Sequence, residues 1–296
     1  MSASPDAGTS LLQRLLRVTG KDRFALAGIA IYVVFALTAV FANLIAIHDP
    51  LEILFLPDGR VAANQQPGGP YWLGTTSLGR DVFSQLVFGA RSAFMVGLSA
   101  ALVVVVAGTL VGLFSGYYGG WVDAVLMRLG DIALSIPFLP FIIVLAAFLK
   151  PNVWNVVIGV SALLWPNTGR IVRSQVLTLR ERSYVEAARV SGASHLRILF
   201  THIAPNVLPI SFLYGSIVIG WAIFTEASVS FLGFGPSDSV SWGFMLQDAF
   251  VSQALSRGAY YWFVPSGLCI MLVVAAGFFI SRGYEELLFP KLRDQQ

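Results

Sequence analysis

Six intervals of the chain contain no Asp, Glu, Lys or Arg, and apolar residues dominate each of them. They run over residues 24–48, 92–122, 132–149, 151–169, 198–225 and 258–281. Each is close to the ~20 residues that a helix needs to cross ~30 Å of hydrocarbon. Because open sheet edges are not tolerated in lipid, runs of this kind predict helices and not strands. The pattern therefore predicts an all-α fold with six transmembrane helices.

Lys and Arg are distributed unevenly among the segments that join these runs. If the N-terminus is cytoplasmic, 14 of the 19 basic residues fall in segments on the cytoplasmic side. The positive-inside rule then predicts that both termini are cytoplasmic. The expected order is a cytoplasmic N-terminal segment, the first transmembrane helix, an extracytoplasmic loop with an interfacial helix, a core of five helices, and a cytoplasmic tail. These parts cover residues 1–23, 24–48, 49–91, 92–290 and 291–296, and the core contains a long cytoplasmic loop at 170–206.

Composition agrees with a protein whose surroundings are mostly lipid. Of the 296 residues, 56% are hydrophobic and only 12% are charged, and the mean hydropathy is +0.74. Soluble domains carry about 25% charged residues, so a soluble enzyme and a disordered chain are both excluded. The single cysteine, Cys269, excludes a disulfide scaffold, and the net charge of +3 is too small to indicate a nucleic-acid partner. A polytopic protein embedded in a lipid bilayer is the class that remains.

Two local patterns stand out in the expected extracytoplasmic loop. Pro57-Asp58-Gly59 separates two short apolar stretches, which predicts a small hairpin. Farther along, apolar and polar residues occupy opposite helical faces, at Val82, Phe83, Leu86 and Val87 and at Arg80, Asp81, Ser84 and Gln85. This amphipathic pattern predicts a helix that lies in the membrane interface and leads into the second span.

The long cytoplasmic loop carries signals for two short helices. Ser183 and Glu186 have the spacing of a capping box, which marks a helix start, and Gly192 is a typical left-handed stop. A second helix is predicted from Ser194 until Pro205 ends it. Two interpretations remain open for this pair of helices. They could lie in the membrane interface, held by lipid headgroups and arginines, or they could dock a cytosolic partner through small residues and complementary charge.

At this loop the sequence resembles the signature of the permease subunits of bacterial ABC importers. Glu186-Ala187-Ala188 is followed after three residues by Gly192, and His202-Ile203-Ala204-Pro205-Asn206 is similar to the variant in the peptide and nickel branch. Other stretches agree with that branch in order and spacing, namely Leu73-Gly74-Thr75, Gly79-Arg80-Asp81-Val82-Phe83-Ser84, Gly116-Tyr117-Tyr118-Gly119-Gly120-Trp121 through Leu126-Met127-Arg128, Leu134-Ser135-Ile136-Pro137 and Ser230-Phe231-Leu232-Gly233-Phe234-Gly235.

The resemblance implies that the chain is one of two transmembrane subunits of an importer in the bacterial cytoplasmic (inner) membrane. The partners that it implies are a homologous second permease in a heterodimer, two P-loop ATPase subunits and an extracytoplasmic solute-binding protein. The substrate that it implies is a peptide, with nickel or an oligosaccharide as the alternative. The residues that it assigns to ATPase coupling are Ser183, Tyr184, Glu186, Ala187, Ala188, Arg189, Gly192, His195, Arg197 and Pro205.

The chain carries no sequence signal for chemistry of its own. Its only Gly-Lys pair, Gly20-Lys21, is followed by Asp22 and lacks the glycine that a P-loop has five residues upstream. No His/Cys cluster predicts a metal site. We therefore expect a non-catalytic subunit without a catalytic, cofactor or metal site, and we expect the separate ATPase subunits to bind ATP and Mg²⁺.

Glu226 is the only acidic residue between Ile198 and Ser237, and it directly follows the charge-free run at residues 198–225. An ionisable residue inside the membrane is a functional candidate by default, and here it would serve as the proton site of a secondary transporter. The alternative, which we favour, is that Glu226 pairs with a serine or a backbone group at a helix interface.

Two further patterns concern contacts between helices. Gly97, Gly108, Gly112 and Gly116 lie on roughly one face of the second span, which predicts close helix packing. Asp131 follows Arg128 by three residues on one helical face, so these two charges are expected to neutralise each other near the inner surface.

Overall fold

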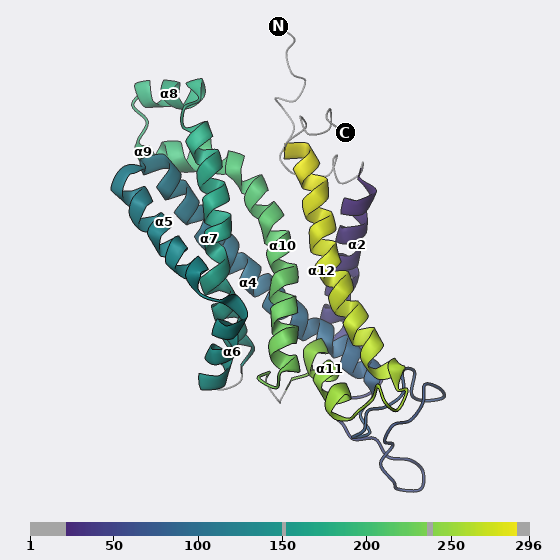
Figure 1. Cartoon of the computed structure of the whole chain (residues 1–296). Coiled ribbons are helices and arrows are strands. Elements are labelled where there is room, and N and C mark those ends of the chain that lie inside the picture. The colour runs from purple at the N-terminus through teal and green to yellow at the C-terminus, as the bar shows by residue number, and fades with distance from the viewer. Residues whose placement is uncertain (1–21, 150–151, 236–238, 289–296) are drawn as a thin grey trace.

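The computed structural model describes residues 22–149, 152–235 and 239–288, with side chains as far as residue 283, and this part of the chain is a bundle of helices (Figure 1). Its elements are α2 (Arg23–Val40), α3 (Ala42–Ile45), α4 (Val82–Tyr118), α5 (Gly120–Ser135), α6 (Phe138–Phe148), α7 (Val153–Leu179), α8 (Ser183–Val190), α9 (His195–Arg197), the π-helix η1 (Ile198–Ile203), α10 (Ala204–Phe231), α11 (Trp242–Val251) and α12 (Tyr260–Leu288). The described residues form no β-strand and only three isolated bridges, all between α3 and α4. The predicted all-α fold is confirmed.

Four of the described helical segments are long and apolar enough to cross a membrane, and a bent pair counts as a fifth if its two helices make one span. The four are α2, α4, α12 and the continuous run from α9 through α10, and the bent pair is α5 with α6. α7 has 27 residues, but its apolar character is interrupted by Asn167, Arg170 and Arg173. Length and apolarity of the described helices therefore support four or five spans and leave the predicted span at residues 151–169, which falls in α7, without this support.

The charge-free run at residues 132–149, predicted as one helix, is broken. α5 ends at Ser135, α6 begins at Phe138, and the two are bent by 80°. Pro137 explains the break, because proline has no backbone N–H and disfavours helical geometry in the residue before it. Ile136 is accordingly extended, with φ −80° and ψ 127°. The prediction of a single helix across this run is wrong.

α4 extends beyond the predicted second span and includes the stretch predicted to lie in the membrane interface. The polar face of that stretch is buried, since Ser84 and Gln85 are at most 1% exposed. Ser84 Oγ accepts hydrogen bonds from the N–H groups of Ile47 and His48 (3.1 and 3.0 Å), and Gln85 Nε2 donates to Pro50 O (3.1 Å). These polar groups hold the chain that follows α3, so the polar face of this stretch packs against protein, and the stretch leads directly into the second span, as the sequence predicts.

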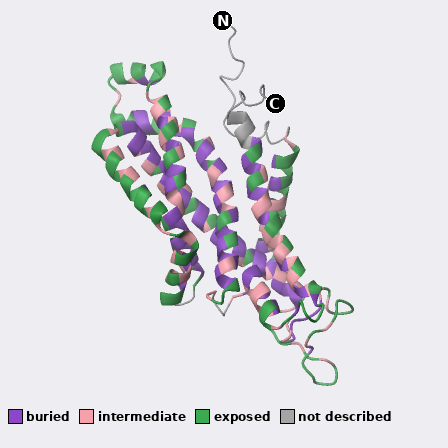
Figure 2. Cartoon of the chain, viewed as in Figure 1, coloured by how far each residue is buried: buried purple, intermediate pink, exposed green. Residues whose placement is uncertain are grey.

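α4 packs against α7 and α10 through its glycines, as the sequence predicted. A Cβ atom on Gly112 would lie 2.6 Å from Gly169 O of α7, and Gly108 and Gly116 approach α7 nearly as closely. Gly97 makes the corresponding contact with α10. Figure 2 shows buried residues along these contacts. Larger side chains at the four positions would force the helices apart.

The two ends of the bundle carry different elements (Figure 1). α8, α9 and η1 lie at the end where α2 begins and α12 ends, whereas α6, α11 and the segment between α3 and α4 lie at the opposite end. In that segment Phe55 bridges Val61, and Leu56 N donates to Arg60 O (2.7 Å). The predicted small hairpin is therefore present.

Candidate functional site

α8 lies at the end of the bundle and is anchored by one face. Val185 is fully buried in an apolar cluster with Ile198 and Leu199, and Ala188 is half-buried against the same cluster. The remaining residues of α8 are exposed, namely Ser183, Tyr184, Glu186, Ala187, Arg189 and Val190. A short helix that is anchored on one side and free on the other is suited to sit in the groove of a partner protein.

The predicted capping box at the start of α8 is not formed. Arg182 occupies the N-cap position in place of Ser183, and no side chain caps this helix. Arg182 N donates to Leu179 O (3.1 Å), and Arg182 O accepts from Glu186 N (3.2 Å), so only a tight turn separates α7 from α8. This turn places Ser183 within the first helical turn, one position too late to cap it. The role of Ser183 as a helix cap is therefore wrong.

Gly192 follows α8 in the left-handed conformation that the sequence predicts. Its φ is +78°, Gly192 N donates to Arg189 O (3.0 Å), and Ala193 N donates to Ala188 O (3.1 Å). This pair of hydrogen bonds is a Schellman motif, which fixes the direction in which the chain leaves the helix. In the described part of the chain, no atom lies within 4 Å of the place that a Cβ on Gly192 would take. Within the chain itself, only backbone conformation disfavours other residues here.

α9 connects the loop to α4. Ser194 caps this short helix, and its Oγ accepts a hydrogen bond from Arg197 N (3.4 Å). His195 Nδ1 shares a hydrogen bond of 2.9 Å with Tyr117 Oη, and its ring contacts the rings of Tyr117 and Tyr118. His195 thus contacts the end of α4, whereas Arg197 is exposed at the surface.

The second loop helix does not end at Pro205. α9 continues into η1, in which Ala204 N donates to Leu199 O, and η1 continues directly into α10. Pro205 lies in the first turn of α10, where the absence of a backbone N–H is tolerated. The run from His195 to Phe231 is one helical segment of 37 residues, so the predicted stop at Pro205 is wrong.

Charged groups join α4, α5 and α7 close to the turn into α8. Arg173 of α7 donates two hydrogen bonds of 2.6 Å to the carboxylate of Asp123 in α5. Ser115 Oγ of α4 donates to the same carboxylate (2.5 Å), and Arg180 Nη1 donates to Gly116 O (3.0 Å). The sequence places these opposite charges just beyond the ends of two predicted spans, but it does not show which of them meet.

A second ion pair joins α5 and α7 farther from α8. Asp131 accepts a hydrogen bond of 2.5 Å from Arg170 Nη2. The sequence predicts instead that Asp131 pairs with Arg128, and the described residues show no such pair. α5 and α7 pack side by side, which brings the guanidinium of Arg170 within direct reach of the carboxylate, and this tertiary contact replaces the local one.

Glu226 lies where α10 meets α11. Its side chain is 2% exposed, and Ser230 Oγ donates to Glu226 Oε1 (2.7 Å). Ser241, the N-cap of α11, is a second hydrogen-bond partner of this carboxyl group. These contacts are those of the serine alternative proposed from the sequence. Among the described residues, no three His, Cys, Asp or Glu side chains lie together as a metal site would require.

Comparisons with known proteins place these features in a family. Residues 108–294 match the family described as "Binding-protein-dependent transport system inner membrane component". The chain is 35% identical to the dipeptide transport system permease protein DppC of Alkalihalophilus pseudofirmus, over 92% of this chain and 88% of that protein. It is 34% identical to the oligopeptide transport system permease protein OppC of Bacillus subtilis, over 92% and 87% of the two chains. It is 36% identical to the glutathione transport system permease protein GsiD of Pectobacterium atrosepticum, over 78% and 76%.

Proposed function

We propose that this chain, which belongs to the family of binding-protein-dependent transport system inner membrane components, is the permease subunit of an ATP-driven peptide importer. The observation that carries the proposal is the exposed helix α8 with its Gly192 stop, which lies within the family match. The similar proteins are described as dipeptide, oligopeptide and glutathione permeases, which favours peptides over nickel or oligosaccharides. The chain is a multi-pass protein of the bacterial inner membrane.

The proposed topology has six spans, with both termini and α8 on the cytoplasmic side. α7 supplies one of the spans. The glycines of α4 let α7 pack closely along α4, and α4 is long and apolar enough to cross the membrane. α5 and α6 together supply another. The excess of Lys and Arg in the cytoplasmic segments supports this orientation, as does the position of α8 at the end where α2 begins and α12 ends (Figure 1).

Single cysteines at two exposed valines test this orientation. Val190 at the end of α8 is 84% exposed, and Val251 at the end of α11 is 71% exposed. In a Cys269→Ala background, a membrane-impermeant thiol reagent should label Val190→Cys only from the cytoplasmic side and Val251→Cys only from the outer side. Labelling of both from the same side would contradict the proposed topology. Peptide uptake by each variant serves as the control for folding.

The proposed role of α8 is to dock an ATPase subunit. A docking helix transmits force only if it is held firmly on its own side, and Val185 is buried in the cluster beneath α8. The Schellman motif at Gly192 fixes the exit from the helix, and the hydrogen bond between His195 and Tyr117 ties the loop to α4. Closure of two ATPases around ATP would then move α8 together with α4 and α7, which is a rigid-body change of the kind that transporters use.

The remaining partners follow from the same proposal. A homologous second permease would complete a heterodimer, and two ATPase subunits would bind ATP and Mg²⁺ in place of this non-catalytic chain. A solute-binding protein would deliver the peptide to the end that carries α11 and the segment between α3 and α4 (Figure 1). That protein would make most of the choice of peptide.

Uptake by the complete transporter tests the proposed function. Proteoliposomes that contain this chain and its partner subunits should accumulate a labelled dipeptide only when ATP is enclosed and the binding protein is added. Uptake should continue after the proton gradient is dissipated. Vesicles without the binding protein are the control. Uptake that needs the proton gradient but not the ATPases would contradict the proposal and favour Glu226 as a proton site, and uptake of nickel or an oligosaccharide in place of peptides would contradict the substrate class.

A further inference from the structure

α5 carries two stripes of exposed residues, one apolar and one polar. The residues of the apolar stripe are 50 to 78% exposed, and they are Trp121, Val125, Leu129 and Ile132. The polar stripe lies about a quarter of a turn away around the helix, and it consists of Arg128, Asp131 and Ser135. A helix surrounded by lipid is apolar on all sides, so the polar stripe indicates a different environment on one side of α5.

α7 continues this polar surface. Between Pro166 and the end of α7, every exposed residue is polar, namely Asn167, Arg170, Ser174 and Thr178. The bond between Arg170 and Asp131 joins this surface to the polar stripe of α5. We term the joined surface the polar lane, and it consists of Arg128, Asp131, Ser135, Asn167, Arg170 and Ser174. Figure 1 shows α5 and α7 side by side below α8.

The polar lane lies alongside a helix that crosses the membrane. A Cβ on Gly108 of α4 would lie 2.7 Å from Thr168 of α7, and a Cβ on Gly112 would lie 2.6 Å from Gly169. α4 is one of the helices long and apolar enough to span, so the α7 side of the lane lies beside that span. Charged and amide side chains at this depth avoid lipid and face either protein or a water-filled cavity.

The end of the lane that is farther from α8 coincides with the break between α5 and α6. There the helical hydrogen bonding stops and the chain bends by 80°. Ser135 and Pro137 are exposed on this chain, and Ile136 is only partly covered. Irregular backbone at membrane depth is tolerated where it is buried in protein or lines a water-filled cavity, and interrupted helices mark the substrate sites of many transporters.

We propose that the polar lane lines the water-filled part of the substrate path that opens toward the α8 end of the protein, and that the path reaches the α5–α6 break. This inference rests on the proposed function as a peptide permease. A peptide needs water or hydrogen-bonding groups for its backbone and terminal charges throughout the crossing, and the lane supplies both donors and acceptors. Arg128 has no ion-pair partner among the described residues, so its guanidinium is available to a peptide carboxylate.

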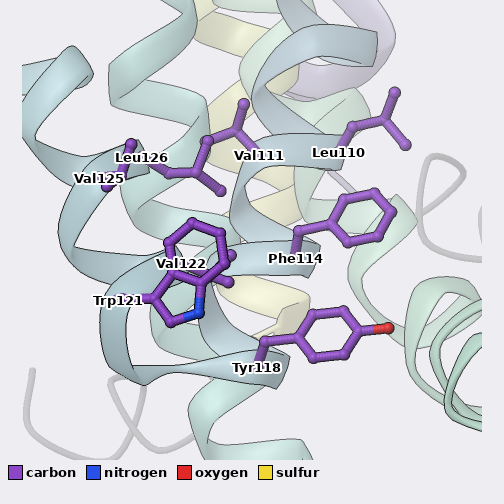
Figure 3. Close-up of a pocket in the computed structure, with 8 residues that line it drawn as sticks. All are labelled: Leu110, Val111, Phe114, Tyr118, Trp121, Val122, Val125 and Leu126. Atoms are coloured by element: carbon purple, nitrogen blue, oxygen red, sulfur yellow. The ribbon is translucent and has the colours of Figure 1, made fainter.

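The apolar stripe of α5 has the opposite character. Its first two residues, Trp121 and Val125, belong to an open groove of about 470 Å³ between α4 and α5, whose other lining residues are Leu110, Val111, Phe114, Tyr118, Val122 and Leu126 (Figure 3). Aliphatic and aromatic side chains of this kind suit lipid hydrocarbon, with Trp and Tyr at the level of the headgroups. The two stripes therefore provide test and control positions on the same helix.

Thiol labelling of the complete transporter tests the polar lane. In inside-out membrane vesicles and a Cys269→Ala background, cysteine replaces Ser135 or Ser174 on the lane and Leu129 on the apolar stripe. A charged, membrane-impermeant thiosulfonate is added at the cytoplasmic face, and labelling is read from the mass of the protein. Ser135→Cys and Ser174→Cys should react at least about tenfold faster than Leu129→Cys. The thiolate is the reactive form of cysteine. Surrounding hydrocarbon raises the pKa of a thiol, and a rise of about one pKa unit already lowers the amount of thiolate tenfold.

The outcomes separate this inference from the proposed function. Fast labelling of both lane positions with slow labelling of Leu129→Cys supports a water-filled lane. Equal rates at all three positions, whether fast or slow, would overturn it, and uniformly slow labelling would place the lane against the second permease or lipid. Since the readout does not involve transport, an incorrect lane would leave peptide uptake intact, and an incorrect substrate class would leave the labelling pattern unchanged.

Discussion

A transporter with Gly192→Val should lose peptide uptake by roughly tenfold or more while still inserting into the membrane. Gly192 has φ +78°, and this left-handed conformation costs L residues about 1–2 kcal/mol. A β-branched residue fits there least well, and each ~1.4 kcal/mol changes a population tenfold. In most copies the chain would then leave α8 in another direction. α8 would no longer be held in the geometry that docks the ATPase subunit. ATP-dependent uptake and ATP hydrolysis by the assembled complex measure the effect.

Gly192→Asn is the matched control for this experiment. Asn is similar in size to Val but enters the left-handed region much more readily, so this variant should retain most of the uptake. Because space around Gly192 is open within the described chain, the two variants differ mainly in backbone conformation. An equal loss of uptake in both variants would mean that a side chain at this position blocks the partner directly, and it would contradict the conformational explanation. Co-purification with the ATPases would show whether either variant still assembles.

Local signals in the sequence were sufficient for some parts of the docking site. The prediction of a left-handed stop at Gly192 is confirmed. How a short helix ends at a glycine depends only on the residues next to it, so the sequence alone is enough to predict it. The prediction of a capping box was wrong because α8 begins one residue earlier than the spacing of Ser183 and Glu186 suggests. The tight turn that follows α7 sets this start, and the spacing of the two residues does not reveal it. Pro205 failed as a stop for a similar reason, since proline is tolerated in the first turn of the helix that follows.

The contacts between helices could not be predicted in the same way. Charge-free runs located the apolar helices. The run at residues 132–149 is nevertheless bent at Pro137, and the positions of the charges do not reveal this break. The pairing of Arg173 with Asp123 joins residues that are 50 positions apart. It depends on the register of α7 against α5, which the packing around α4 sets and which no local pattern records.

The pair formed by Arg173 and Asp123 leads to the second large effect that we expect. Asp123→Asn should destabilise the chain in detergent by about 2 kcal/mol, because hydrogen bonds to charged groups contribute about 1.5–3 kcal/mol and the change leaves a charged guanidinium without its counter-ion. The two side chains are only 32% and 20% exposed, so solvent screens the pair weakly. Since the pair joins α5 to α7 beside the turn into α8, uptake should fall more than ATP hydrolysis does. Thermal unfolding in detergent and the ratio of peptide transported to ATP hydrolysed measure the two effects.

Asp131→Asn provides the matched control, because it breaks the other ion pair between α5 and α7. The side chains of Arg170 and Asp131 are 47% and 49% exposed, and exposed pairs contribute about 0–1 kcal/mol. This variant should therefore unfold at nearly the same temperature as the unaltered chain. The exchanged double variant Asp123→Arg with Arg173→Asp restores opposite charges across the same helices and should recover part of the lost stability and transport ratio. If Asp131→Asn lowers the unfolding temperature as much as Asp123→Asn does, or if the exchange recovers no stability, the link between α7 and α5 does not depend on the charge pair beside α8. In that case the packing of α4 against α7 would have to hold the two helices together by itself.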